Sequence, residues 1–206
     1  MKKLILIFLL SLFVTFCQRK NSISDLEINT IISNDTITQF EKLAIKNDTL
    51  EYVNFDPFIF LKSGHLFGEN KKQYIKLSVK SEKVMHLELY ILKNDTWIIN
   101  DRLDLNNDFI LPSFNYKIKD YNFDSCNDLY IQRFSTNGLG MSYGYLITLN
   151  KNLKMNHQQE TDDLSNMTID YEHEQLISDS IISNINGRFI LKNYYYWKNN
   201  KLKKVN

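Results

Sequence analysis

The segment from Asp120 to Asp128 carries oxygen-bearing residues at a spacing that can bind a divalent cation. Asp120, Asn122, Asp124 and Asp128 occupy positions 1, 3, 5 and 9 of this stretch, so that alternate side chains can turn inward in a tightly wound loop. Position 7 normally contributes its backbone carbonyl, which leaves its side chain free to be that of Cys126. We predict that these five residues are the metal ligands of one structural calcium ion. The alternative is an acidic turn without a metal.

The residues around this loop argue against an EF-hand. Ser125 stands where glycine normally makes the sharp turn, and Ile131 stands where an EF-hand has a bidentate glutamate. A predicted strand, Leu129–Phe134, takes the place of the exiting helix. The pattern instead resembles the calcium loops of FG-GAP and integrin-type β-propeller repeats, in which such a loop leads directly into a strand.

A second motif, Gly140-Met141-Ser142-Tyr143-Gly144, matches the Gly-x-Ser-x-Gly nucleophile elbow of hydrolases. That elbow needs a strand before the serine and a helix after it. The residues that follow, Tyr145–Leu149, have the composition of a strand, and the chain lacks alternating strand and helix units. We therefore predict a glycine-rich loop between two strands and no catalytic residue. The alternative is an envelope hydrolase or a carbohydrate-binding protein that uses Ser142 or the acidic loop.

The histidines and the remaining acidic residues give weaker signals. His65, His86, His157 and His173 do not show the spacing of zinc ligands. Paired carboxylates such as Asp162-Asp163 are most simply loop residues, because glycoside hydrolysis needs a carboxylate separation that the sequence does not define. These residues therefore carry no functional prediction.

The first residues, MKKLILIFLLSLFVTFC, have the form of a bacterial lipoprotein signal peptide. Lys2 and Lys3 are followed by an uncharged run, Leu4–Phe16, which as a helix would span roughly 20 Å, less than the roughly 30 Å of a bilayer core. Cleavage before Cys17 would allow lipidation of this cysteine, although the bulky Phe16 is atypical at such a site. The alternatives are plain secretion and an uncleaved anchor.

Charge and cysteine content narrow the functional classes further. Loss of residues 1–17 would remove two lysines from the 25 basic residues, against 24 acidic ones, so the remaining chain is nearly neutral. This balance argues against nucleic-acid binding, which requires a basic surface. Once Cys17 is lipidated, Cys126 has no partner for an intrachain disulfide and is best interpreted as a small apolar residue.

The elements that would position the loop are predominantly strands. Tyr, Phe, Ile and Thr are abundant, and apolar and polar residues alternate between turns rich in Asn and Asp. We predict an all-β fold, mainly an antiparallel meander and partly β-propeller-like, with short helices at Asp25–Ile32 and Ile37–Leu43. Residues 1–17 form the signal peptide, 18–24 a tether and 25–206 a single domain. The predicted strands begin with Leu43–Ile45 and Leu50–Val53, and the last hairpin turns at Asn199-Asn200.

Three segments together resemble a bacterial family of periplasmic lipoproteins with one FG-GAP-type loop in a β-meander. They are Asn122-Phe123-Asp124, Asp128-Leu129-Tyr130-Ile131 and the stretch 138–145. Flavobacterial relatives share the final hairpin, residues 197–202. The resemblance covers roughly residues 60–206 and is specific only around 120–145.

This family includes an immunity protein that inhibits a secreted peptidoglycan hydrolase. The resemblance therefore implies a non-enzymatic protein-binding module, an immunity protein or inhibitor, that is anchored by lipid in the cell envelope, in the periplasm or at the outer-membrane surface. The implied contacts are a protein partner in the envelope and the membrane through the N-terminal lipid, with no nucleic acid.

Overall fold

The computed structural model describes residues 34–68, 71–110, 114–136, 140–185 and 187–205. The signal peptide, Cys17, the tether and the helix predicted at Asp25–Ile32 lie outside the described residues. Within them, no helix is long and apolar enough to cross a membrane. The chain divides into two compact units, Met1–Leu43 and Ala44–Asn206, and the second holds all the strands described below.

One α-helix, α3 (Asn34–Lys46), contains the helix predicted at Ile37–Leu43 and extends it at both ends. Phe40 and Ala44 are buried at a spacing of four residues, as one face of a helix requires. Asp35 in the first turn and Lys46 in the last complement the helix dipole. The strand predicted at Leu43–Ile45 is therefore wrong, because these residues continue the helical periodicity.

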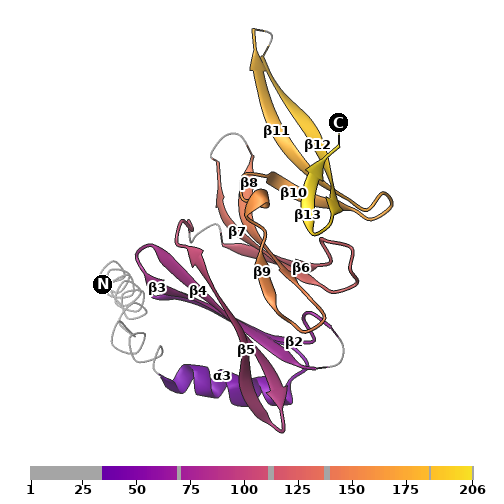
Figure 1. Ribbon diagram of the computed structural model, residues 1–206. Coiled ribbons are helices and arrows are strands. Elements are labelled where there is room, and N and C mark those ends of the chain that lie inside the picture. Colours follow the sequence, from indigo (N-terminus) through magenta and orange to yellow (C-terminus); the bar gives the residue numbers. More distant parts are fainter. Residues whose placement is uncertain (1–33, 69–70, 111–113, 137–139, 186, 206) are drawn as a thin grey trace, which may run out of the picture. The chain divides into compact units, whose positions relative to one another are not determined.

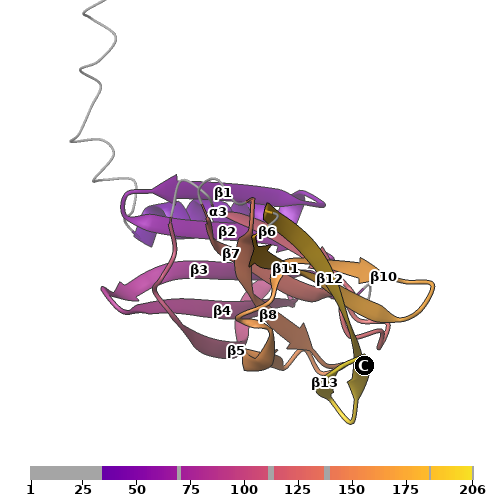
Figure 2. The same cartoon turned by 90° about the horizontal axis from the view of Figure 1, so that it is seen from above.

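The rest of the described chain forms three antiparallel sheets (Figure 1), which confirms the all-β prediction. Figure 2 shows the strands of the first sheet in their sequence order. Sheet A contains β1 (Leu50–Phe55), β2 (Phe58–Gly64), β3 (Gln73–Ser81), β4 (Val84–Lys93) and β5 (Thr96–Asn106). Sheet B contains β6 (Asn115–Lys119), β7 (Asp128–Ser135), β8 (Ser142–Leu149) and β9 (Met155–His157). After the 3-10 turn η3 (Gln159–Thr161), sheet C contains β10 (Ser165–Asp170), β11 (Gln175–Asn184), β12 (Gly187–Lys198) and β13 (Lys201–Lys204).

Each sheet is a meander, in which strands that are consecutive in sequence pair with each other. The tight turns follow local chemistry: Asn94-Asp95 and Asn199-Asn200 all have positive φ, the conformation that a two-residue hairpin turn of type I′ requires. The predicted final hairpin is thus confirmed. The partly propeller-like arrangement of the meanders stays a prediction.

The two central strands of sheet B, β7 and β8, are buried on both faces. Leu129 and Ile131 of β7 join a core with the apolar side chains of sheet A, including Leu77 and Leu87. Tyr130, between them in the sequence, points to the opposite face and packs in a second core with Met167 and Leu176 of sheet C. Alternation along β7 and β8 therefore fixes the order of the three sheets, and both strands are held from two sides.

A buried glutamate ties the strands of sheet A together. Glu88 of β4 is 5% exposed and pairs with Lys76 of β3 at 2.8 Å and with Arg102 of β5 at 3.1 Å. Burial alone would raise the pKa of Glu88, but the bond to Lys76 and its charge outweigh burial and hold this pKa below its usual value. The carboxylate is therefore charged when the protein is folded.

Glu88→Gln is expected to lower the free energy of unfolding by about 2 kcal/mol at neutral pH, because two cationic side chains lose their counter-charge. Since the folded pKa of Glu88 lies below the unfolded one, its contribution is present above the ordinary glutamate pKa and is lost as the pH falls through the folded value. The difference between wild type and variant should therefore shrink as the pH is lowered below the ordinary glutamate pKa. Urea unfolding at neutral and at acidic pH measures it, and a constant difference would contradict this role of the ion pairs.

Candidate functional site

The loop before β7 is closed by its own side chains. The carboxylate of Asp120 accepts hydrogen bonds from the backbone N–H groups of Asp124 (3.2 Å) and Ser125 (2.9 Å). Asp124 in turn accepts one from the N–H of Cys126 at 2.8 Å. Ser125 has a φ of +69°, the conformation for which glycine is preferred. The loop predicted from the sequence is thus present as a compact turn.

Asp128 has a role that sequence reasoning missed. It is the first residue of β7, is fully buried and accepts three backbone hydrogen bonds. Its Oδ2 atom accepts from the N–H groups of Tyr121 (2.8 Å) and Asn122 (3.2 Å), and its Oδ1 atom accepts from the N–H of Leu149 at 2.9 Å. Burial raises the pKa of Asp128 to about 7, against the opposing effect of the Leu149 and Tyr121 amides. Asp128 therefore fastens the loop to the end of β8.

The arrangement fits calcium in part. Asp120, Asn122 and Asp124 offer the hard oxygen donors that calcium takes, and the amide of Asn122 lies 3.1 Å from the carboxylate of Asp124. Both oxygens of Asp128 already accept backbone N–H groups. Within the described parts of the chain, no three His, Cys, Asp or Glu side chains gather as a ready metal site. Calcium binding stays a prediction.

Cys126 is a free, half-buried thiol. Burial, followed by the charge of Asp124, raises the pKa of this thiol above its usual value. The thiolate, the reactive form, is therefore disfavoured at neutral pH. The geometry agrees with a structural residue.

Two hollows flank the loop. The larger, about 480 Å³, is lined by Ser125 and Cys126 of the loop and by residues of the segments around 67–73 and 151–153. Its polar lining includes Lys71, Lys151 and Asn152. The smaller, about 280 Å³, is lined on the loop side by Asn122 and Asp124 and elsewhere mainly by amides. The loop thus forms a wall shared by two surface hollows with amide-rich and cationic linings.

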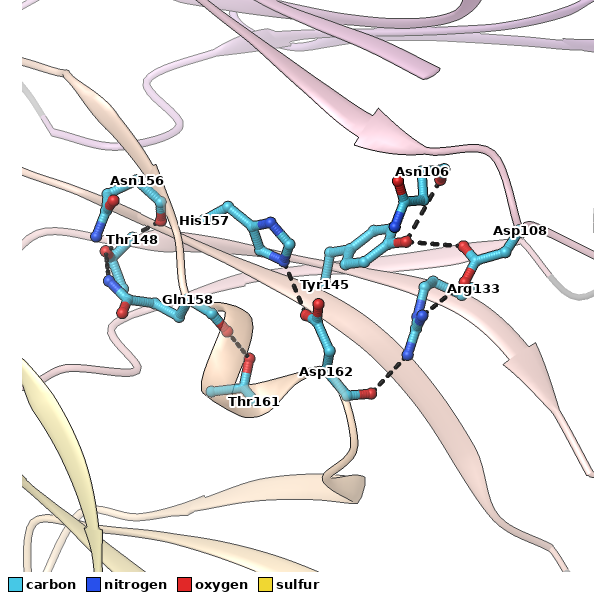
Figure 3. A network of polar contacts seen from close by, with 10 residues as sticks. All are labelled: Asn106, Asp108, Arg133, Tyr145, Thr148, Asn156, His157, Gln158, Thr161 and Asp162. Atoms are coloured by element: carbon cyan, nitrogen blue, oxygen red, sulfur yellow. Dashed lines mark hydrogen bonds and ion pairs between the residues drawn. The ribbon is translucent and has the colours of Figure 1, made fainter. Parts of the chain in front are cut away.

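Beyond the loop, a buried arginine clamps sheet B to its neighbours (Figure 3). Arg133 of β7 is 9% exposed, pairs with Asp108 at 2.6 Å and donates to the carbonyl of Asp162 at 2.5 Å. The hydroxyl of Tyr145 donates to the same Asp108 carboxylate at 2.8 Å, and His157 lies 2.8 Å from the carboxylate of Asp162. These bonds join the segment after β5, three strands of sheet B and the turn after η3.

The electrostatics of this cluster favour a fixed charge pair. Burial would lower the pKa of Arg133, but Asp108 and Tyr145 outweigh it and raise this pKa. Burial and then Asp108 raise the pKa of Tyr145 to about 12, so the phenol stays protonated. Neither group exchanges a proton near neutral pH. We therefore interpret the cluster as a structural clamp.

A strand and not a helix follows Ser142, as predicted, but the predicted loop is wrong for residues 142–144: Ser142 is the first residue of strand β8 and pairs with Ser135 of β7. Its hydroxyl donates to the side-chain oxygen of Asn166 at 3.0 Å, and its N–H donates to the same atom at 2.8 Å. Gly144 of the same motif has a packing role, because a Cβ atom there would lie 2.5 Å from the carbonyl oxygen of Ile131 and against the ring of Tyr130. The motif is explained by packing and strand pairing.

The four histidines do not share bonding partners with one another. His86, His157 and His173 bond to different aspartates, Asp104, Asp162 and Asp170, while His65 is exposed. They form no shared metal site among the residues that the structure describes.

Comparison with known proteins finds no match: no family model, no curated protein and no solved structure matches this chain. The resemblance to the periplasmic lipoprotein family therefore stays a prediction from the loop and its surroundings.

Proposed function

We propose that the protein is a non-enzymatic binding module of the cell envelope, anchored by a lipid at Cys17, that holds a protein partner at the larger hollow. In line with the resemblance at residues 120–145, the proposed partner is a peptidoglycan hydrolase, for which this chain would be an inhibitor or immunity protein. The observation that carries the proposal is the chemistry of the hollow of about 480 Å³: lysines, amides and apolar side chains line it.

The lining defines what such a partner must offer. Lys71 and Lys151 are exposed and can pair with carboxylates, while Asn100 and Asn152 can bond to backbone groups. The partly exposed side chain of Leu153 supplies apolar surface that is favourable to bury. An acidic loop or strand with one apolar side chain fits this lining best.

The scaffold supports a binding role because it holds these segments in place before a partner arrives. Sheet B is packed on both faces, Asp128 ties the loop to β8, and Arg133 clamps the opposite end of β7. Preformed loops lose little conformational entropy on binding, which favours affinity.

Calcium would add to this rigidity. In our proposal Asp120, Asn122 and Asp124, with the carbonyl of Cys126, hold the ion, which neutralises the repulsion between the carboxylates. Asp128 contributes as the buried acceptor that fixes the loop's exit. Since Ser125 and Cys126 line the larger hollow, a stiffer loop also gives a better-defined binding surface.

The proposal predicts that reversing the charge of the hollow weakens partner binding. The double variant Lys71→Glu, Lys151→Glu should recover roughly tenfold less partner than wild type in affinity capture from envelope extract, because like charges then face the partner's carboxylates. EDTA in the extract should reduce the yield from wild type without abolishing it.

A matched control is Lys80→Glu combined with Lys83→Glu, which reverses two exposed lysines at the β3–β4 hairpin, at the opposite end of these strands from Gln73 and Ile91. This control should capture as much partner as wild type, and all three proteins should have the same melting temperature. Equal capture by both double variants would reject the hollow as the binding site.

A further inference from the structure

The central hairpin of sheet C is longer than the strands beside it. β10 pairs with β11 only as far as Asp179, and β13 pairs with β12 only from Tyr195 to Lys198. The β11–β12 pairing, in contrast, continues to Asn184 and Gly187. Figure 1 shows this two-stranded ribbon running past the ends of β10 and β13. Its outer portion has no neighbouring strand on either side within the described residues.

This portion exposes large apolar side chains that a water-soluble surface would rarely gather. They form what we call the hairpin tip: Ile182 (46% exposed), Ile185 (100%), Phe189 (50%), Ile190 (64%) and Leu191 (47%). Ile182 is opposite Phe189 in the register, while Ile190 is opposite Ile181 and therefore on the other face. The tip thus exposes apolar side chains on both faces. Exposed apolar groups gathered in this way mark an interaction site.

The charge within the outer part of the hairpin is cationic. Between residues 180 and 191 the only ionisable side chain is that of Arg188, which is exposed, and the next charges along the ribbon are Lys192 and Asp179, opposite each other in the register. Apolar side chains with a cation beside them suit the headgroup region of an anionic bilayer.

We propose that the hairpin tip inserts into the headgroup region of an anionic lipid bilayer. A groove on a protein partner would have to enclose both faces and the end of the ribbon, whereas a bilayer surrounds an inserted tip without further adaptation. The unpaired backbone edges of the ribbon exclude deep insertion, because the hydrocarbon core cannot satisfy them. An interfacial depth of about 5–10 Å corresponds to the turn and to the two or three strand residues on either side of it. Ile185 in the turn, Ile182 and Phe189 would then lie in the headgroup region.

This second membrane contact goes beyond the proposed function and needs neither the lipid at Cys17 nor the hollow. With an N-terminal anchor, it would fix the orientation of sheet C relative to the membrane. The cationic side chain of Arg188 lies close to the turn and is long enough to reach back to anionic headgroups.

Quenching of fluorescence by brominated lipid tests the proposal in the full chain. Phe189→Trp places an indole in the hairpin tip, and Phe55→Trp, at a phenylalanine of β1 with 53% exposure, is the matched control. The unsubstituted chain gives the baseline from Trp97 and Trp197. With anionic vesicles, Phe189→Trp should show a blue shift and strong quenching by bromine near the headgroups. Phe55→Trp should show neither.

Removing the cation should weaken the contact. In the Phe189→Trp background, the lipid concentration for half-maximal quenching should rise roughly fivefold for Arg188→Gln. Unquenched fluorescence at position 189, or equal quenching at positions 189 and 55, would overturn the proposal. A blue shift given by envelope proteins and not by vesicles would also overturn it, and would assign the tip to a protein partner.

Discussion

Asp128→Ala is expected to lower the free energy of unfolding by about 3–5 kcal/mol. The substitution removes the acceptor of three backbone N–H groups, those of Tyr121, Asn122 and Leu149, in a fully buried position. Each buried donor that loses its partner costs about 1–3 kcal/mol, and water entering the space left by the carboxylate offsets part of the sum. Urea unfolding in calcium-free buffer measures the loss. A loss below about 1 kcal/mol would mean that the loop is held by other contacts.

Asp124→Ala is the matched control for this prediction. Asp124 lies in the same loop but is exposed, and it accepts local N–H groups that water can also satisfy. Its loss should have little effect in calcium-free buffer. Millimolar calcium should stabilise the wild type by about 0.4–1.4 kcal/mol, if the ion binds with the affinity typical of extracellular modules. The Asp124 variant should lose this gain, and identical calcium titrations of the two proteins would mean that the loop is only a turn.

The second large effect is expected at Gly144→Ala, with a loss of about 3 kcal/mol in the free energy of unfolding. The added methyl group would lie 2.5 Å from the carbonyl oxygen of Ile131 and against the ring of Tyr130, so strand β7 or the ring must move. Both residues are buried in packed cores, on opposite faces of sheet B. Overpacking of this kind costs about 1–3 kcal/mol or more when the backbone is the obstacle.

Gly140→Ala is the control within the same motif. A Cβ atom at Gly140 meets nothing within 4 Å, so only its φ of +64° resists the substitution. The expected loss is about 1 kcal/mol. Thermal unfolding of the two variants compares the sites directly. Equal losses in the free energy of unfolding would show that close packing is not the reason for a glycine at position 144.

The loop that contains Asp128 shows how much of the candidate site can be predicted from the sequence alone. Alternation and turn composition predict the strands and the Asn199-Asn200 turn, because both depend on neighbours in the chain. The oxygen spacing also predicts the turn at Asp120–Asp128. The acceptor role of Asp128 toward Leu149 could not be predicted, since this contact joins residues that are 21 positions apart.

Other features could not be predicted for the same reason, because they depend on residues that are far apart in the sequence. The clamp at Arg133 draws its partners from three separate segments, at Asp108, Tyr145 and Asp162. The lack of neighbours along the outer part of β12 depends on where β10 and β13 end, which no local pattern in the sequence marks. At Leu43–Ile45 the apolar run fits a helix as well as a strand, and the helical spacing of Phe40 and Ala44 decides the outcome.

The central claim is that a protein partner occupies the hollow beside the loop. Site-specific photocrosslinking in intact cells tests it most directly, with a benzophenone side chain placed at Asn152, in the wall of the hollow, or at Lys83, in a distant turn of sheet A. The account predicts a crosslinked protein of defined mass from position 152 that disappears in the Lys71→Glu, Lys151→Glu background, and none from position 83. No crosslink from position 152, or the same crosslinked protein from both positions, would contradict it.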